Sequence, residues 1–435
     1  MKYDKKLSIP LFQVNSHRAN ILVVVILLAG IWLLTACDQQ PLYDFNRPNN
    51  ALTGIDTLQA DYTGGFARAF RSRVFEFPQD HLAHPEFKHE WWYFTGNLST
   101  STGDRLGYQL TLFRIGLKPE EKVIKTKDYV SGASGQQSEQ ESDWRTNHIY
   151  MGHLALTDIT NQQFYHYEKF SRGVMGMAGS ELVKTGMKEQ TADESTAIKI
   201  WLENWQITSH SQTTFPLSVS AHKGEVAIEL TLDPLKPVVY HGYEGLSQKG
   251  RKQGNASYYY SITRLDTKGK ISIKDQTFNV TGTSWFDREW STSTLEKQQV
   301  GWDWFALQLD DGRDIMFYKM RREDNSMDRY SNGTIVSKNG ETTALNFEDV
   351  DLEETDFWQS PHSAVKYPSA WKIRIPKENL ELTVEPLMDD QENNLTVRYW
   401  EGAVKVQGIQ HNDRNKAQVS GYGYVELAGY KQPKL

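Results

Sequence analysis

Residues 84–98 read His-Pro-Glu-Phe-Lys-His-Glu-Trp-Trp-Tyr-Phe-Thr-Gly-Asn-Leu, and this stretch decides the fold class. Its second half, from Glu90 to Leu98, is rich in large aromatic side chains, which favours a β-strand. Gly103-Asp104 then supplies turn chemistry, and 106–115 is predicted as the partner strand of a hairpin. No segment after residue 75 shows a long helical period. The sequence therefore predicts an all-β, antiparallel protein.

Further strands are predicted on both sides of Gly301. The first set is 148–158, 163–170, 197–208, 215–221, 224–232, 256–265, 269–274 and 277–286. The second set is 302–310, 313–322, 329–338, 341–348, 370–376, 381–388, 395–407 and 418–430. Asp311-Gly312 and Asn339-Gly340 are hairpin-type turns within the second set. We place a domain boundary near residue 296, because each half has enough strands for a barrel or sandwich. Residues 118–145 are polar and are predicted to form one long surface loop.

Composition narrows the class of protein. The 435 residues suggest two or three domains, and 38% hydrophobic content is enough for a sizeable core. A net charge of −7 argues against a partner that is a nucleic acid. The 13 Trp, 21 Tyr and 18 Phe fit an aromatic-rich β protein, and a single cysteine excludes an intramolecular disulfide.

The N-terminus has the parts of a secretory signal. A basic segment precedes an apolar run at 21–36, which is short for a membrane-spanning helix. The run ends in Leu34-Thr35-Ala36-Cys37, which resembles a bacterial lipobox. We therefore predict that residues 1–36 are a lipoprotein signal peptide and that Cys37 is lipidated. The alternative is an uncleaved anchor helix with an incidental cysteine, and both interpretations tether the protein to a membrane.

The segment after the cysteine predicts the cellular location of the protein. Asp38 resembles an inner-membrane retention signal, so we expect a lipid-anchored protein of the bacterial cell envelope that faces the periplasm. Residues 37–77 contain polar residues, Gly and Pro without a clear amphipathic period, and are predicted to be a polar tether.

Six blocks of sequence carry a resemblance to a known family. They are 84–98, 107–114 (Gly-Tyr-Gln-Leu-Thr-Leu-Phe-Arg), 144–153 (Trp-Arg-Thr-Asn-His-Ile-Tyr-Met-Gly-His), 284–290 (Ser-Trp-Phe-Asp-Arg-Glu-Trp), 301–309 (Gly-Trp-Asp-Trp-Phe-Ala-Leu-Gln-Leu) and 399–404 (Tyr-Trp-Glu-Gly-Ala-Val). In this order they resemble the AttH/CrtC family, lipocalin-like proteins labelled as predicted secreted hydrolases, with carotenoid hydratases as distant members. The resemblance implies two lipocalin-like antiparallel β-barrel domains with apolar interiors, at 78–296 and 297–435.

The hydratase branch of this family ties water addition to four residues. They are an Asp, a Tyr two positions before it, and an upstream His-x-Trp pair. Here Asp287 matches the Asp, Trp285 stands at the Tyr position, and Tyr258 and Tyr260 stand at the upstream pair. The resemblance therefore implies an acid at Asp287, and leaves open an acid-catalysed reaction in an aromatic pocket other than carotenoid hydration.

Strand parity gives the first candidate site. Side chains alternate between the two faces of a strand, so Trp285, Asp287 and Glu289 share one face. If this face lines an apolar barrel interior, the pKa of at least one carboxyl should rise, which gives a general acid near neutral pH. If the face looks outward, Asp287 and Glu289 are solvated or paired with bases.

The other candidates each have a structural alternative. Glu90 shares a face with Trp92 and Phe94, so it is either a pocket acid or the partner of Arg114 in a salt bridge that closes the barrel. His153 is either a catalytic or ligand-contacting group or a satisfied core histidine. Further candidates for ligand binding are aromatic, and each is otherwise a packed core residue. They are Trp92, Tyr258, Tyr260 and Trp285, with Arg114 as a polar member.

Motifs for several reaction classes are absent from the sequence. There is no Gly-x-Ser-x-Gly elbow, no Walker A loop and no Cys/His cluster with metal-ligand spacing. We therefore expect no metal and no cofactor.

Three functions stay open. The one we favour at this stage is an exported lipocalin-like module that binds an apolar small molecule or lipid, for which the family resemblance implies a partnership with an ABC transporter. The alternative is a secreted hydratase- or hydrolase-like enzyme that acts on a terpenoid or other apolar substrate, with Asp287 as general acid. The third is a scaffold whose surface binds a partner.

Overall fold

The computed structural model describes residues 52–53, 64–119, 146–183, 196–210, 212–293, 295–411 and 416–431. The expected signal peptide, most of the expected tether and most of the expected loop at 118–145 lie outside these ranges. Residues 51–435 belong to one compact unit. Within the described part of the chain, no helix is both long and apolar enough to cross a membrane.

The first sheet contains thirteen strands of the described chain, in the order β5-β4-β3-β2-β14-β13-β10-β9-β8-β7-β6, with β11 and β12 paired to β13. Its strands are β2 (His89–Thr100), β3 (Arg105–Gly116), β4 (His148–Asp158), β5 (Gln163–Ser171), β6 (Ala178–Leu182), β7 (Ile198–Leu202), β8 (Trp205–Ser209), β9 (Leu217–Lys223), β10 (Val226–Pro234), β11 (Val239–Tyr240), β12 (Leu246–Gln248), β13 (Ala256–Ile273) and β14 (Gln276–Ser291).

The second sheet contains eleven described strands, in the order β18-β17-β16-β15-β24-β23-β21-β20-β19, with β1 and β22 paired to β23. Its strands are β1 (Leu52–Thr53), β15 (Gln299–Leu309), β16 (Asp314–Arg322), β17 (Asn332–Val336), β18 (Thr342–Asn346), β19 (Asp351–Gln359), β20 (Lys366–Ile375), β21 (Leu380–Pro386), β22 (Glu392–Asn394), β23 (Val397–His411) and β24 (Lys416–Ala428). The helices of the described chain are short 3₁₀ turns, η1 (Gln79–His81), η2 (Val174–Gly176), η3 (Phe347–Asp349) and η4 (Pro376–Glu378).

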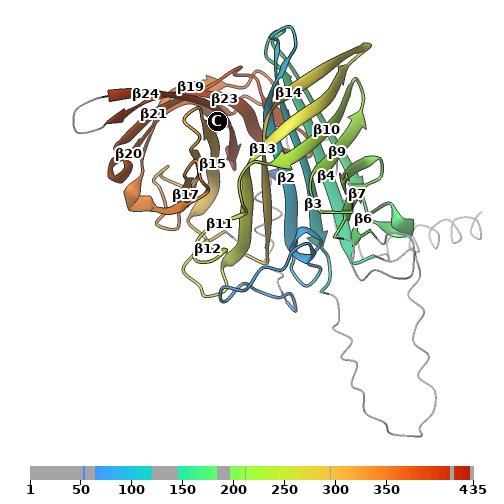
Figure 1. Cartoon of the computed structure of the whole chain (residues 1–435). Helices are drawn as coiled ribbons and strands as arrows, with labels where there is room; N and C mark the ends of the chain where they lie inside the picture. Colours follow the sequence, from blue (N-terminus) through green and yellow to red (C-terminus); the bar gives the residue numbers. More distant parts are fainter. Residues whose placement is uncertain are drawn as a thin grey trace, which may run out of the picture. The chain divides into compact units, whose positions relative to one another are not determined.

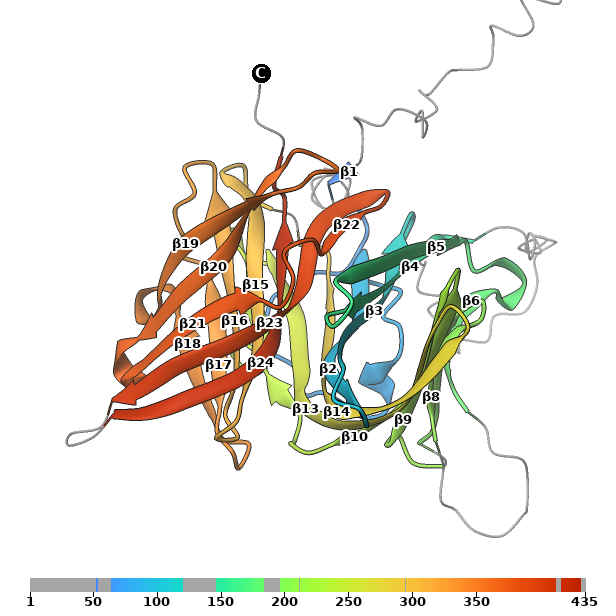
Figure 2. The same ribbon diagram turned by 90° about the horizontal axis from the view of Figure 1, so that it is seen from above.

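Both sheets curl into barrel-like domains by the same plan (Figure 1). Each begins with a four-stranded meander, β2 to β5 or β15 to β18. Each ends with a strand that pairs with the first one, β14 with β2 and β24 with β15. Figure 2 shows the two curled sheets beside each other, with these central strands between them. The predicted fold class, two lipocalin-like antiparallel β-barrel domains, is confirmed, and the two halves share their topology as well as a similar strand count.

The strands follow the sequence pattern with local differences. The segments expected at 256–265 and 269–274 are one strand, β13, with an irregularity between Ile262 and Leu265. The segment expected at 197–208 is two strands, because Glu203 adopts a φ of 54° in a turn between them. The sequence reading missed β19, whose residues Asp-Leu-Glu-Glu-Thr-Asp-Phe-Trp-Gln are largely exposed and acidic. The short strands β6, β11, β12 and β22 were missed too, since so few residues carry little periodicity.

The chain passes from the first sheet to the second between Ser291 and Gln299. This interval contains the expected boundary at residue 296. Residues 51–435 belong to one compact unit, and the division into domains at 78–296 and 297–435 stays a prediction.

Each barrel encloses its own apolar core. The first core includes Trp92 and Phe94 of β2 and Phe286 and Trp290 of β14. The second includes Phe305 and Leu307 of β15 together with Trp371, Trp400 and other apolar side chains.

A third apolar cluster lies between the two sheets. Tyr93, Tyr259 and Trp285 from the first sheet meet Trp304, Tyr318 and Tyr424 from the second. The central strands are therefore buried on both faces: in β2, Trp92 and Phe94 face the barrel interior, while Tyr93 faces the other sheet. Strands that are covered on both faces have apolar residues on both faces, which explains the near-continuous aromatic run from which the fold was predicted.

Candidate active site

A pocket of about 200 Å³ lies between the two sheets, outside both barrel interiors. Its lining is His89, Glu90, Trp91, Tyr93, Phe113, Arg114, Ile115, Met151, His153, Lys249, Ser257, Tyr259, Asp287, Glu289, Ser291, Ser293, Leu295, Trp302, Trp304, Tyr318, Met320, Val397, Tyr399, Glu426 and Ala428. The sequence left two possibilities open for the face of β14 with Asp287 and Glu289, outward or toward a barrel interior, and the structure does not place it in the interior of the first barrel. Phe286 and Trp290 take that side, and Asp287 and Glu289 face the second sheet.

The strand register arranges the first wall of the pocket in three rows. The inner row is Ser261, Asp287, Tyr93, Thr111 and His153. The middle row is Tyr259, Glu289, Trp91, Phe113 and Met151. The edge row is Ser257, Ser291, His89 and Ile115. Successive rows are two residues apart on each strand, so all three rows present their side chains on the same face of the sheet.

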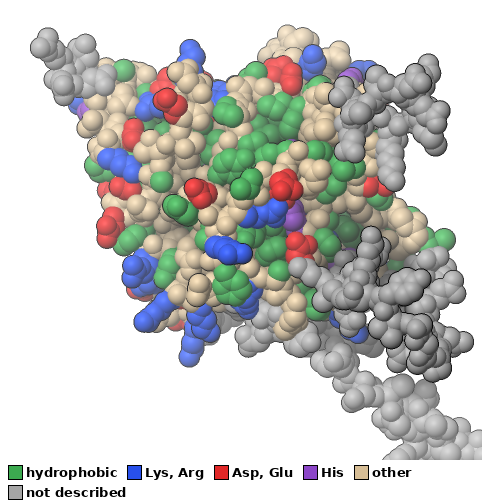
Figure 3. Space-filling model, turned by 60° about the horizontal axis from the view of Figure 1, so that its bottom comes forward, with side chains coloured by type: hydrophobic (Ala, Val, Ile, Leu, Met, Phe, Trp, Pro, Cys, Tyr) green, Lys and Arg blue, Asp and Glu red, His purple; other side chains and the backbone are tan. Residues whose placement is uncertain are grey.

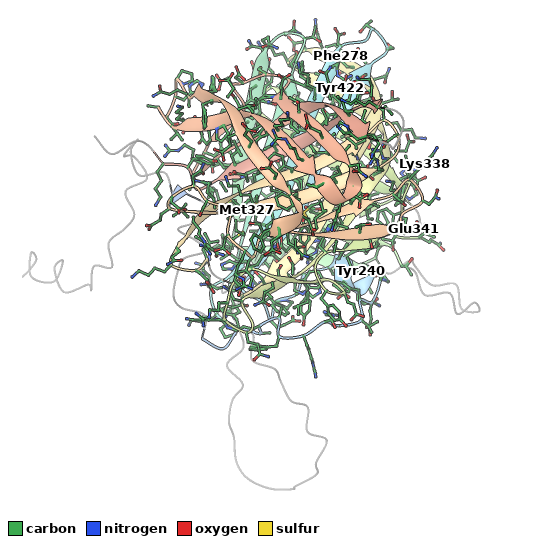
Figure 4. The ribbon with its side chains drawn as sticks, turned by 90° about the vertical axis from the view of Figure 1, so that its left-hand side faces the viewer. Tyr240, Phe278, Met327, Lys338, Glu341 and Tyr422 are labelled. Atoms are coloured by element: carbon green, nitrogen blue, oxygen red, sulfur yellow. The ribbon has the colours of Figure 1, made fainter. Side chains whose placement is uncertain are left out.

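The edge row lies near one end of the molecule. Phe278 of β14 and Tyr422 of β24 are at the opposite end from Tyr240, which pairs with β13 (Figure 4). Since Ser291 is the last residue of β14 and Phe278 is near its start, the edge row lies toward the end at which Tyr240 is found. Figure 3 views the molecule with its bottom forward, where hydrophobic side chains gather with acidic, basic and histidine side chains among them.

Asp287 is the central acid of the first wall. Its side chain accepts hydrogen bonds from the Tyr259 hydroxyl at 2.5 Å, from the Trp285 indole N–H at 2.6 Å and from the Ser261 hydroxyl. No lysine or arginine of the described residues forms an ion pair with it, and it is only 3% exposed. Burial raises the pKa of Asp287 to about 7, although these three hydrogen bonds act to lower it. A large share of this carboxyl is therefore protonated at neutral pH.

Glu289, two residues further along the strand, has a different environment. The Lys249 ammonium lies 3.2 Å from its carboxylate and 3.9 Å from the centre of the Tyr318 ring. Burial alone would lower the pKa of Lys249, but Glu289 and Tyr318 together outweigh it and the pKa is raised. Asp287 is therefore a buried acid without a base, which was one alternative for this face. Glu289 is paired with a base, which was the other.

The second sheet carries two carboxyls that sequence reasoning missed, of which Glu426 lines the pocket. Glu426 of β24 accepts a hydrogen bond from the Trp302 indole N–H at 2.7 Å, and burial raises its pKa to about 7. Its neighbour on β23, Glu401, accepts one from the Tyr93 hydroxyl at 2.5 Å, and burial raises its pKa well above the usual range. The available signal was a glutamate inside a strand with apolar neighbours, as in Val425-Glu426-Leu427.

His153 lies in the inner row and contacts the second sheet. Its Nδ1 is 2.7 Å from the Tyr399 hydroxyl, and its Nε2 has no hydrogen-bond partner among the described residues. Burial lowers the pKa of His153 to about 3, so the ring is neutral. A neutral imidazole with one free nitrogen can orient a water molecule or a substrate oxygen, but it does not serve as a cationic acid.

Glu90 and Arg114 form a structural ion cluster. The Glu90 carboxylate is fully buried and contacts the guanidinium groups of both Arg114 and Arg288. Burial by itself would raise the pKa of Glu90, but the two positive charges hold it well below the usual range. Arg114 also donates to the backbone oxygens of His84 and Phe87. Although both residues border the pocket, this geometry supports the alternative of a salt bridge inside the barrel.

Three of the expected ligand-binding residues lie away from the pocket. Trp92, Tyr258 and Tyr260 belong to the core of the first barrel. The Tyr260 hydroxyl bonds to His81, and the Tyr258 hydroxyl donates to a backbone oxygen. Their neighbours Trp91 and Tyr259 line the pocket instead, because adjacent residues face opposite sides of a strand and both sides of these strands are aromatic. Trp285 contributes through its hydrogen bond to Asp287.

No group of three or more His, Cys, Asp or Glu side chains within the described ranges is placed to hold a metal ion. The arrangement instead places two protonatable carboxyls, Asp287 and Glu426, on opposite walls of an aromatic pocket.

Comparison with known proteins agrees with this fold. A family model described as AttH-like matches residues 68–430. A crystal structure of a proposed AttH protein from Nitrosomonas europaea is similar at a TM-score of 0.68 and 29% identity, covering 84% of this chain and 100% of that one. Kievitone hydratase from Nectria haematococca is similar in fold at a TM-score of 0.54 and 15% identity, covering 85% of this chain and 98% of that one. A search of curated proteins finds no significant match.

We predict that Glu90→Gln destabilises the protein by about 3–5 kcal/mol, because it leaves two buried guanidinium groups without their counter-charge. Urea denaturation measures this loss. The control is Glu385→Gln, which removes one partner of the exposed Lys405–Glu385 pair and should cost about 0–1 kcal/mol. Equal losses in the two variants would contradict the structural role of Glu90.

We also predict a pH dependence of stability that depends on Asp287. Its pKa is about 7 in the folded protein against 3.8 ordinarily, so between these values the folded state binds more protons than the unfolded state. The free energy of unfolding contributed by this group therefore falls as the pH rises through that window. Urea denaturation at pH 5 and pH 8 should show a steeper fall for the wild type than for Asp287→Asn, since the other acids contribute to both. Parallel profiles would show that the carboxyl titrates normally.

Proposed function

The chain belongs to the AttH-like family, and from this premise we propose that it is an enzyme that transfers a proton to an apolar small molecule in a hydratase-type reaction. The observation that carries the proposal is the carboxyl of Asp287, which is buried without a base and faces an aromatic pocket. A general acid must hold its proton near the working pH, and burial is the usual physical means of arranging this for an aspartate.

The proposed reaction adds water across a carbon–carbon double bond. Asp287 gives its proton to one carbon, so that a C–H bond forms as the π bond breaks and the carboxyl becomes a carboxylate. The electron-deficient carbon that results lies among the faces of Tyr259, Trp304 and Trp91, which attract positive charge. A water oxygen then bonds to this carbon, and its surplus proton passes to a carboxylate.

Glu426 is the proposed acceptor of that proton. It lies on the wall opposite Asp287, and the two groups are close enough for the charge of Asp287 to raise the pKa of Glu426. His153 lines the pocket from the inner row, and its Nε2, which has no partner among the described residues, is the proposed group that holds the attacking water. The products balance the reactants, since an alkene and water give an alcohol and both carboxyls recover their protonation through solvent.

The geometry favours this enzyme over a simple carrier of an apolar ligand, which the sequence alone favoured. A carrier needs an apolar cavity, and an acid buried without a base makes such a protein less stable. Here Tyr259, Ser261 and Trp285 all direct hydrogen bonds at one carboxyl that a carrier would not require. That arrangement is typical of a group retained for chemistry.

The cellular location is part of the proposal and rests on the sequence. A lipidated Cys37 would hold the enzyme at the envelope facing the periplasm, with Asp38 favouring the inner membrane. Partnership with an ABC transporter stays an expectation from the family resemblance. Labelling cells with a fatty-acid analogue, with Cys37→Ser as the control, tests the anchor.

We predict that Asp287→Asn lowers turnover by about 100- to 10,000-fold, the usual contribution of a general acid. The assay is mass spectrometry of apolar alkenes incubated in deuterated water, which records added water and deuterium at carbon. Asp275→Asn is the matched control, because it makes the same change at an exposed position of the same hairpin. Full activity of Asp287→Asn would refute the proposal, and so would the absence of turnover by the wild type across alkenes that bind in the pocket.

A further inference from the structure

Two polar side chains of the edge row have no protein partner. Neither ring nitrogen of His89 nor the hydroxyl of Ser257 has a hydrogen-bond partner among the described residues. Both residues line the pocket, with His89 only 4% exposed and Ser257 fully buried. A buried polar group without a partner costs about 1–3 kcal/mol, so two of them in one row indicate that a ligand supplies the missing bonds.

The strand register places Ser257 and His89 on the two strands that flank Ser291. Ser257 pairs with Ser291, and Ser291 pairs with His89 on the next strand. Neighbouring strands are about 4.8 Å apart, so the two backbone positions are about 10 Å apart. The side chains of His89 and Ser257 therefore stand on the same face of the sheet, with only the strand of Ser291 between them, and both border the pocket, so that one ligand can contact both.

The charge state of the edge row favours a neutral ligand group over an anionic one. Burial, together with the charges of Lys88 and Arg114, lowers the pKa of His89 to about 3, so its imidazole is neutral, with one donor and one acceptor. The nearby cations are engaged, Lys249 with Glu289 and Arg114 with Glu90. A hydroxyl or carbonyl oxygen matches a neutral imidazole and a serine hydroxyl, whereas a carboxylate or phosphate would find no free positive charge among the described residues of the pocket.

The middle row separates this polar row from the acid. Ser291 follows Asp287 by four residues on the same strand, which spans about 13 Å. Trp91, Phe113 and Met151 lie between the two rows and present apolar surface, next to Glu289, whose carboxylate is paired with Lys249. A ligand that reaches both rows must therefore have an apolar body of about that length.

We infer that His89 and Ser257 form a subsite for a neutral hydroxyl or carbonyl group of the substrate, two rows away from Asp287 on the same face of the sheet. The subsite orients an otherwise apolar molecule with its double bond at the inner row and its oxygen at the edge row. This inference deepens the proposed function by naming the substrate class, and its orientation toward Asp287 rests on that function.

The test measures binding and needs no turnover. The probes are 1-decanol, 1-decene and decanoate, which share a ten-carbon chain and differ at one end. Quenching of tryptophan fluorescence reports binding, because Trp91, Trp302 and Trp304 line the pocket. We expect the wild type to bind 1-decanol about tenfold more tightly than 1-decene and to bind decanoate most weakly. Equal affinities, a preference for decanoate or no binding of 1-decanol would overturn the inference.

Substitutions test whether His89 and Ser257 cause the preference for 1-decanol over 1-decene. Ser257→Ala and His89→Phe should each weaken 1-decanol binding about five- to tenfold while leaving 1-decene binding within about twofold. Ser272→Ala, on the same strand outside the pocket, should change neither. If His89→Phe does not fold, His89→Gln keeps a neutral polar group and should retain the preference for the alcohol. Equal loss of both probes in Ser257→Ala and in His89→Phe would show that the residues only support the fold.

Asp287→Asn separates this inference from the proposed function. The variant should keep the preference for 1-decanol, since the subsite lies two rows away. Retained preference together with a wild type that converts no alkene would refute the proposed function and leave the subsite in place. Loss of the preference in Asp287→Asn would overturn a subsite that is separate from the acid.

Discussion

The structure depends on the contact between the two sheets, in which polar groups of one sheet are bonded to the other inside an aromatic layer. The Tyr93 hydroxyl donates to Glu401, the Trp304 indole donates to Tyr259, and His153 bonds to Tyr399. Each bond joins residues more than forty positions apart in the chain. Without these contacts, one face of the central strands would expose large aromatic side chains to water.

The same contact determines the chemistry of the pocket. Three carboxyls, Asp287, Glu401 and Glu426, are enclosed between the sheets, and burial raises the pKa of each. The guanidinium groups of Arg114 and Arg288 hold the pKa of Glu90, another acid of the same region, well below its usual range and keep it charged. Acids of one residue type thus differ in protonation because some have a base beside them and others have hydroxyl and indole donors.

The limits of prediction are clearest on β2 and β13. Alternation correctly grouped Trp92 with Phe94, and Tyr258 with Tyr260, but both faces of these strands are aromatic. Nothing local in such a strand distinguishes a barrel interior from a surface between barrels. The acid Asp287 was identified because its strand carries two carboxylates in an aromatic run, while Glu426 has no comparable local pattern.

The sequence by itself determined most of the long strands and the hairpins at Gly312 and Gly340, because these follow from residue type and short-range spacing, and its six ordered blocks pointed to the family and to the candidate acid. Only the tertiary structure decided that the functional face of β14 meets the second sheet, that Tyr259 rather than Tyr258 reaches Asp287, and that Glu426 lies opposite. The physical reason is that alternation along a strand is local, whereas the neighbour across each face comes from a distant part of the chain.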